Sequence, residues 1–165
     1  MNHRITLAPL LLLAIAAAFL VTGCGSSGNS VELSFKSSFM DRKAESTGSG
    51  GSNMAMTVAG HGKLINESGK EMGTFNVTST VTGETADSET RFVNAEYSFG
   101  AQGMDSILIS GAEVFTKELG LPFLNRPLYY AVVGGTGKYT GANGECLVHR
   151  TGENDFTTTC TFTTP

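Results

Sequence analysis

The sequence predicts an all-β domain of about eight short antiparallel strands. Short runs rich in β-branched and aromatic residues alternate with clusters of Gly, Asn, Asp and Ser, which is typical of strands joined by turns. No segment reads as a long helix, because the best candidate, Val114 to Gly120, is short and ends at a glycine before Pro122. A sandwich and a closed barrel both fit this pattern, and strand spacing alone does not choose between them.

The expected strands follow one another from residue 31 to the end of the chain. They are expected at residues 31–39, 53–59, 62–67, 73–82, 91–99, 104–115, 128–133, 143–151 and 156–163. The Gly and Ser stretch at residues 46–52 (STGSGGS) is expected to form a loop inside the domain. It is not expected to mark a domain boundary, because too few residues remain for a second domain.

The first 24 residues have the layout of an export signal. One cation, Arg4, precedes an apolar run and then small residues. The end of this run, LVTGC at residues 20–24, resembles a bacterial lipobox, in which diacylglycerol alkylates the cysteine thiol before cleavage. We therefore expect a lipoprotein signal peptide at residues 1–23, a lipidated Cys24 at the head of a flexible tether (residues 24–30) and a single domain at residues 31–165.

The alternatives for the N-terminal segment are a transmembrane helix over residues 5–22 and an ordinary cleaved signal. A Gly-Cys step followed by a polar linker favours the lipoprotein. Such a protein would be held in the cell envelope by its lipid anchor, facing the periplasm or the exterior, with the membrane as its partner.

Size and charge exclude some function classes. Removal of residues 1–23 would leave 142 of the 165 residues, which suits one domain with a real core. The formal net charge of −4 would become −5, because the removed segment holds Arg4 and no Asp or Glu. No basic cluster appears, so we expect no nucleic-acid partner.

Five glycines crowd into residues 131–145 (AVVGGTGKYTGANGE). A P-loop would end in Gly137 and Lys138, but Val132 stands where its first glycine belongs and Tyr139 where it needs Ser or Thr. A dinucleotide fingerprint also lacks its last glycine, and the residues that follow read as a strand. We therefore interpret the glycines as turn and close-packing devices that bind nothing directly.

The same stretch is similar to the motif shared by plant dirigent proteins and the allene oxide cyclase family. In that motif an apolar strand runs into GGTG or GGSG, then an aromatic residue, then a G-A-x-G step. Residues 96–100 (EYSFG) and 107–111 (ILISG) look like the two strands that precede it. The resemblance covers about residues 94–150, and its structural glycines are Gly134, Gly135, Gly137, Gly141 and Gly144.

This resemblance implies an eight-stranded antiparallel calycin-like β-barrel, which is often a homotrimer in the relatives. A closed barrel also removes the exposed strand edges of an all-β protein. With eight strands, the lumen can be filled by side chains or can hold one small ligand.

Cys146 and Cys160 flank a turn cluster centred on Glu153, so their strands are expected to pair as a hairpin with the two cysteines directly opposite. Alternation then places both cysteines on one apolar face with Val148, Phe156 and Phe162. A disulfide follows. The alternative, a reactive thiol with His149 as its base, is disfavoured because residues three apart in a strand point to opposite faces.

Candidate catalytic groups are scattered along the chain. Glu96, Tyr97 and His61 come first, followed by Tyr129, Tyr130 and His149, and any of them in a barrel mouth could do acid-base work. The histidines lack metal-site spacing, so no metal and no cofactor is expected.

Three functions remain open. The first is a barrel that binds a small, mostly apolar molecule, and the second is an isomerase or cyclase of the allene oxide cyclase type. The third is a structural or interaction module whose barrel is filled by its own side chains. Residues 31–43 offer Glu32 and Asp41 but no equivalent of the glutamate and asparagine that the cyclases use. The lumen discriminates among the three: convergent polar groups favour catalysis, an apolar pocket binding, and a packed interior the module.

Overall fold

The computed structural model describes residues 28–45, 52–100 and 103–165. The strands are β1 (Asn29–Glu45), β2 (Thr57–Ile65), β3 (Glu71–Glu84), β4 (Ser88–Phe99), β5 (Asp105–Thr116), β6 (Leu121–Pro122), β7 (Pro127–Thr136), β8 (Asn143–Arg150) and β9 (Asp155–Thr164), with one short 3₁₀ helix, η1 (Gly137–Tyr139), between β7 and β8. The expected lipidation site, Cys24, lies outside the described residues. Within them, no helix has the length and apolar character needed to cross a membrane.

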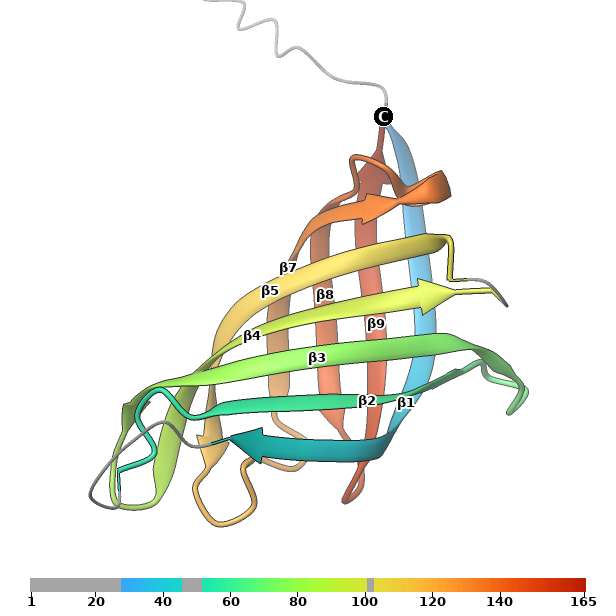
Figure 1. Cartoon of the computed structure of the whole chain (residues 1–165). Coiled ribbons are helices and arrows are strands. Elements are labelled where there is room, and N and C mark those ends of the chain that lie inside the picture. Colours follow the sequence, from blue (N-terminus) through green and yellow to red (C-terminus); the bar gives the residue numbers. More distant parts are fainter. Residues whose placement is uncertain (1–27, 46–51, 101–102) are drawn as a thin grey trace, which may run out of the picture.

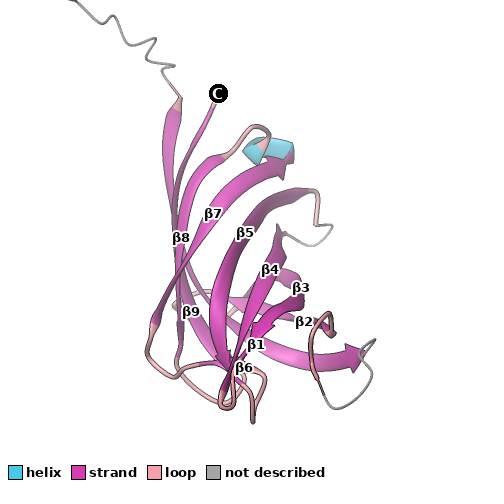
Figure 2. Cartoon of the chain, turned by 90° about the vertical axis from the view of Figure 1, so that its left-hand side faces the viewer, coloured by secondary structure: helices cyan, strands magenta, loops and turns pink. Residues whose placement is uncertain are grey.

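The strands form a closed, antiparallel, eight-stranded barrel, with β6 as a two-residue addition beside the end of β5 (Figure 1). Each long strand pairs with its neighbour along the chain, and the circle is closed where β1 pairs with β9 over ten residue pairs. Figure 2 shows the strands wrapping around a common interior from the side. The predicted fold class is confirmed, and the sandwich alternative is wrong.

Two predicted strands, 53–59 and 62–67, are in fact one strand, β2. The prediction separates the two strands at residues 60 and 61, but Gly60 and Gly62 lie inside β2 and face aromatic rings. A Cβ on Gly60 would lie 2.6 Å from a ring carbon of Phe39, and one on Gly62 would lie 2.5 Å from Phe75. These glycines therefore make room for interior side chains rather than bend the chain.

The segment at 114–120, the best helical candidate in the sequence, does not form a helix. Its first residues, Val114 to Thr116, finish β5, and the rest form a turn that ends at Gly120 with a φ of 58°. The short helix that does form, η1, falls inside the glycine-rich stretch.

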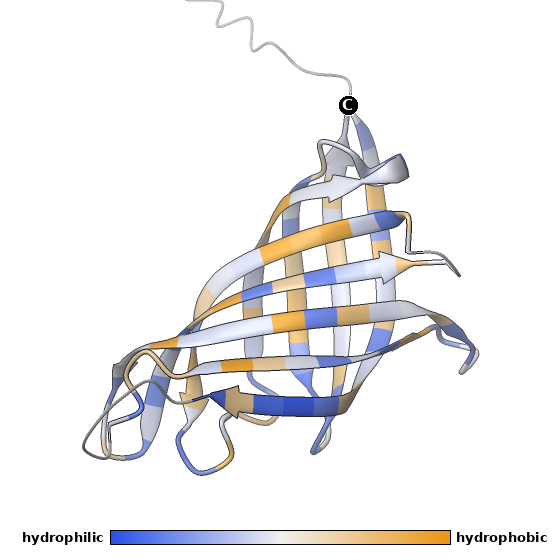
Figure 3. Ribbon diagram, in the orientation of Figure 1, coloured by the Kyte–Doolittle hydropathy of each residue, from blue (hydrophilic) through white to orange (hydrophobic). Residues whose placement is uncertain are grey.

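Alternation along the strands builds the interior. In β9, Phe156, Thr158, Cys160 and Phe162 are buried and the residues between them are more exposed. Figure 3 shows the same change of hydropathy from residue to residue along the strands. Cys146 pairs with Cys160 in the β8–β9 hairpin, and the predicted disulfide joins them.

A chain of aromatic contacts runs through the interior from one end of the barrel to the other. The rings meet edge to face or tilted at centroid distances of 4.9 to 6.4 Å, in the order Phe156, Phe39, Phe75, Tyr97, Phe35, Phe99, Tyr139 and Phe162. Such contacts add to area burial by about 0.5–1.5 kcal/mol each. They make the core continuous along the barrel axis.

The glycine-rich stretch closes the end of the barrel where Tyr139 enters. Tyr139 is buried between Phe99 and Phe162. The Lys138 backbone N–H donates to Asp105 Oδ1 at 3.1 Å, which lowers the pKa of that carboxyl and holds η1 against β5. Gly137 has a φ of 58°, a conformation that side chains disfavour.

Replacement of Gly135 by alanine should lower the free energy of unfolding by about 1–3 kcal/mol, as overpacking does. The new Cβ would overlap the carbonyl oxygens of Tyr139 and Ser106, the latter at 2.6 Å. Its neighbour Gly134 is the matched control, because a Cβ there meets only a Leu108 methyl at 3.9 Å. Urea unfolding of Gly135→Ala and Gly134→Ala measures the difference, and equal midpoints would contradict this account of the glycines.

Candidate ligand-binding site

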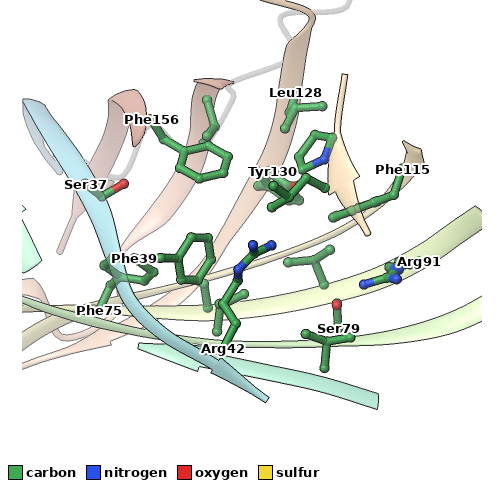
Figure 4. Close-up of a pocket in the computed structure, with 18 of the residues that line it drawn as sticks. Ser37, Phe39, Arg42, Phe75, Ser79, Arg91, Phe115, Leu128, Tyr130 and Phe156 are labelled. Atoms are coloured by element: carbon green, nitrogen blue, oxygen red, sulfur yellow. The ribbon is translucent and has the colours of Figure 1, made fainter. Parts of the chain in front are cut away.

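The barrel contains an unfilled interior cavity of about 80 Å³ (Figure 4). Its lining is mostly apolar and comes from nearly every strand, and it includes Phe39, Phe75, Val77, Val93, Ala95, Tyr97, Ile109, Phe115, Leu128, Tyr130, Val148 and Phe156. A water needs at least about 10–15 Å³ of such space, so the cavity exceeds a single solvent site. The third outcome anticipated for the lumen, complete filling by side chains, is therefore not what the structure has.

A larger hollow of about 510 Å³, here called the vestibule, lies at the barrel mouth. It shares five lining residues with the cavity: Phe39, Arg42, Val58, Arg91 and Gly120. The remaining walls come from the end of β1, Met56 before β2, the β5–β6 turn and Asn154 in the β8–β9 turn. The cavity and the vestibule thus form one path from the interior to the surface.

Four hydroxyl groups belong to the cavity lining: those of Ser37, Ser79, Tyr97 and Tyr130. All four residues are buried. The hydroxyls of Ser37, Ser79 and Tyr130 have no hydrogen-bond partner among the described residues. These three oxygens keep some accessible surface, so a polar atom that occupies the cavity can form hydrogen bonds with them.

Burial raises the pKa of Tyr97 to about 12, and the Thr158 hydroxyl opposes part of that rise. That hydroxyl is itself buried and makes no hydrogen bond of acceptable geometry in the described part of the chain. Burial also raises the pKa of Tyr130, with Tyr97 and Glu113 adding to the effect. Both phenols therefore keep their protons at neutral pH and act in the lumen as hydrogen-bond donors, not as bases.

A buried ion pair lies at the border of cavity and vestibule. Arg91 donates from Nε to Glu89 Oε2 at 2.9 Å, and its guanidinium lies 5.1 Å from the centroid of the Phe115 ring. Glu89 also accepts a hydrogen bond from the Asn53 amide at 2.6 Å. The charge of Arg91 is therefore compensated by Glu89. The ion pair has a structural role at the mouth, and Arg91 is not a free cation there.

The side chains that line the cavity can donate hydrogen bonds to a bound molecule and can enclose it. Among the described residues that line it there is no carboxylate and no imidazole, so it holds no ordinary general base. No group of residues in the described ranges could hold a metal ion. The lumen can enclose an apolar molecule and donate hydrogen bonds to an oxygen on it.

The sequence-predicted candidates divide between the two faces of the barrel wall. Tyr97 and Tyr130 line the cavity. Asn76 of β3 pairs with His61 of β2 on one side and with Glu96 of β4 on the other, so the three side chains lie on the same, outer face of the barrel. Glu96 is half-buried there, and His61 is exposed. Tyr129 and His149 are also on the outer face and are not part of the lumen lining.

Sequence reasoning missed four lining residues: Arg42, Arg91, Ser37 and Ser79. Alternation could have found Arg91, because it shares a face with Val93, Ala95 and Tyr97. Nothing in the sequence distinguishes the two serines from the many other Ser and Thr residues of the chain.

The chain matches no protein-family model and no curated protein in sequence. Its fold matches solved structures. A pyocyanin demethylase is 17% identical with a TM-score of 0.63, over 80% of this chain and 99% of that one. The Diels-Alderase AbmU from Streptomyces koyangensis is 11% identical with a TM-score of 0.63, over 86% of this chain and 71% of that one.

A pterocarpan synthase dirigent protein is 13% identical, with a TM-score of 0.57, over 90% of this chain and 97% of its own. At these identities the likeness concerns the fold alone. The barrel is of the dirigent and cyclase-like kind, as the glycine motif predicts.

The raised pKa of Tyr97 predicts a loss of stability at high pH. The folded state keeps the phenolic proton between pH 10, the ordinary pKa of a tyrosine, and about pH 12, whereas the unfolded state loses it. By pH 11, one unit into that window, the contribution of Tyr97 should therefore lower the free energy of unfolding by about 1.4 kcal/mol, and Tyr130, whose pKa burial also raises, should add to the fall. Urea unfolding at pH 9 and pH 11 measures this. The fall should be smaller in Tyr97→Phe than in the natural protein. Tyr129→Phe should show the same fall as the natural protein, because Tyr129 is exposed. An equal fall in all three proteins would contradict the assignment.

Proposed function

We propose that this protein binds a small, mostly apolar molecule in the barrel lumen. The observation that carries the proposal is the unfilled apolar cavity with three unpartnered hydroxyls, open to the surface through the vestibule. Pockets of this composition, with few polar groups among aromatic and aliphatic walls, are the usual form of small-molecule sites. The names of the structural neighbours, a demethylase, a Diels-Alderase and a pterocarpan synthase, refer to activities on small organic molecules and support this class of ligand.

The second candidate is an isomerase or cyclase that acts on an oxidised lipid or a phenolic intermediate. The observation that favours it is the pair of neutral phenols, because Tyr97 and Tyr130 could donate to a carbonyl oxygen as negative charge develops on it. Catalysis would then depend on orientation and hydrogen-bond donation, since the cavity lining offers no base. The structural module, the third candidate, is the least compatible with a cavity of this kind.

The lipid anchor, the envelope location and the oligomer are part of the proposal. Cys24 would carry the lipid and hold the barrel at a membrane, close to apolar molecules. A homotrimer would cover the apolar side chains that are exposed on the outer face, among them Leu108 and Val133. No nucleic acid and no cofactor is part of the proposed function.

Native mass spectrometry of residues 25–165, purified from the natural host without detergent, tests ligand binding. We expect a small molecule that is retained in the native species and lost on denaturation, and the same spectrum gives the oligomeric state. Ser79→Leu should fill the cavity and abolish retention, whereas Thr78→Leu, on the outer face of the same strand, should retain the molecule. A clean apoprotein mass for the natural protein would contradict the binding proposal.

Cys24→Ala tests the anchor. Without the thiol no diacylglycerol can be attached, and cleavage, which follows alkylation, should not occur, so the variant should keep residues 1–23 and should not incorporate radiolabelled palmitate. Palmitate incorporation by Cys24→Ala, or its absence from the natural protein, would contradict the anchor.

A further inference from the structure

A β-bulge in β1 decides which charged side chain enters the barrel mouth. Phe39 pairs with Gly62 and Asp41 with His61, so Met40 is an extra residue on β1 without a partner on β2. Before the bulge the odd-numbered residues Phe35 to Phe39 face inward; after it, the parity changes. Asp41 thus pairs on the outer face with exposed His61, and Arg42 faces inward opposite Gly60.

Arg42 is held at the border of cavity and vestibule. It lines both, although the residue as a whole is exposed, and its side chain extends from β1 toward the middle of the pocket (Figure 4). Its guanidinium carbon lies 5.5 Å from the centroid of the Phe39 ring. A Cβ on Gly60 would lie 3.2 Å from Arg42 Cγ, so the glycine leaves space for the arginine stem.

The Arg42 guanidinium has no carboxylate partner in the described part of the chain. Asp41 and Glu118 also line the vestibule, yet neither forms an ion pair with it. Residues outside the described ranges contain neither Asp nor Glu. The charge of Arg42 is therefore left to solvent or to a ligand.

The other cations around the mouth are satisfied internally. Arg91 pairs with Glu89, and Lys117 Nζ lies 3.2 Å from Glu84. Arg150 is buried and donates to backbone carbonyls, to Gly152 O at 2.9 Å and Pro122 O at 3.1 Å, and it lines neither the cavity nor the vestibule. Among the described residues that line the vestibule, Arg42 is therefore the cation that no carboxylate pairs.

We propose that Arg42 anchors a carboxylate of the bound molecule, so that the ligand is an amphipathic carboxylic acid whose apolar body enters the lumen. This inference rests on the proposed binding function and names its ligand class. The guanidinium offers a planar fork of donors that matches a carboxylate in bidentate geometry. Stacking against Phe39 restricts the arginine before the ligand arrives, which reduces the entropy cost of binding.

Two naphthalene compounds of nearly equal shape provide the test: 1-naphthaleneacetate and its neutral amide, 1-naphthaleneacetamide. The chain contains no tryptophan, so naphthalene emission can be followed with little protein background. Residues 25–165, which include every strand of the barrel, are titrated as the natural sequence, as Arg42→Gln and as Lys43→Gln. Lys43 is the matched control, because it carries the same charge on the next residue, pairs with Glu45 and lines neither hollow.

We expect the natural sequence to bind the carboxylate about tenfold more tightly than the amide, in the range of a charge-assisted hydrogen bond. Arg42→Gln should lose this preference, because its affinity for the carboxylate falls more than its affinity for the amide, and Lys43→Gln should keep the preference. If Arg42→Gln retains the preference, or if the natural sequence shows none, the carboxylate proposal is overturned and lumen binding stands. If no protein binds either compound, the proposed binding function itself is contradicted.

Discussion

The pairing of the first strand with the last is the interaction on which the rest of this structure depends. Ten residue pairs between β1 and β9 turn a row of hairpins into a closed barrel. Closure leaves no exposed edge on the long strands and creates one interior, in which rings from strands far apart in sequence meet. Phe39 of β1, for example, contacts both Phe75 of β3 and Phe156 of β9. Without closure neither the aromatic chain nor the cavity would exist.

The two ends of the barrel have opposite characters because they are built from different kinds of side chain. One end is sealed by Tyr139 and by glycines that allow strands and η1 to approach closely. At the other end a polar network of Glu84, Glu89, Asn53, Arg91 and Lys117 ties the loops together by charge-assisted hydrogen bonds. Such a network can border an opening without filling it, since its members satisfy one another rather than pack across the lumen.

The sequence was most informative where local alternation decides the outcome. The opposition of Cys146 and Cys160 follows from a period-2 pattern, and the barrel class follows from the glycine motif. Arg42 could not be predicted in this way. Simple alternation from Phe39 would have placed Asp41 in the mouth, and only the register with β2 reveals the bulge at Met40 that reverses the parity.

Glycine was the other source of error, because the residue has two uses that look alike in a sequence. Gly137 adopts a left-handed conformation, whereas Gly62 lies in an ordinary strand, where the absence of a side chain leaves space for the Phe75 ring. Which use applies depends on what packs opposite the glycine, and that partner is distant along the chain.

The position of the chain ends has a consequence for how the barrel can be attached. Asn29 and Thr164 pair at one end of the β1–β9 ladder, whereas Ser38 and Asp155 pair at the other, beside the vestibule. The start of β1 and the end of β9 therefore lie at the end of the barrel away from its opening. A surface joined to the barrel directly beside these residues would adjoin the sealed end, so that molecules would exchange at the opposite end without obstruction.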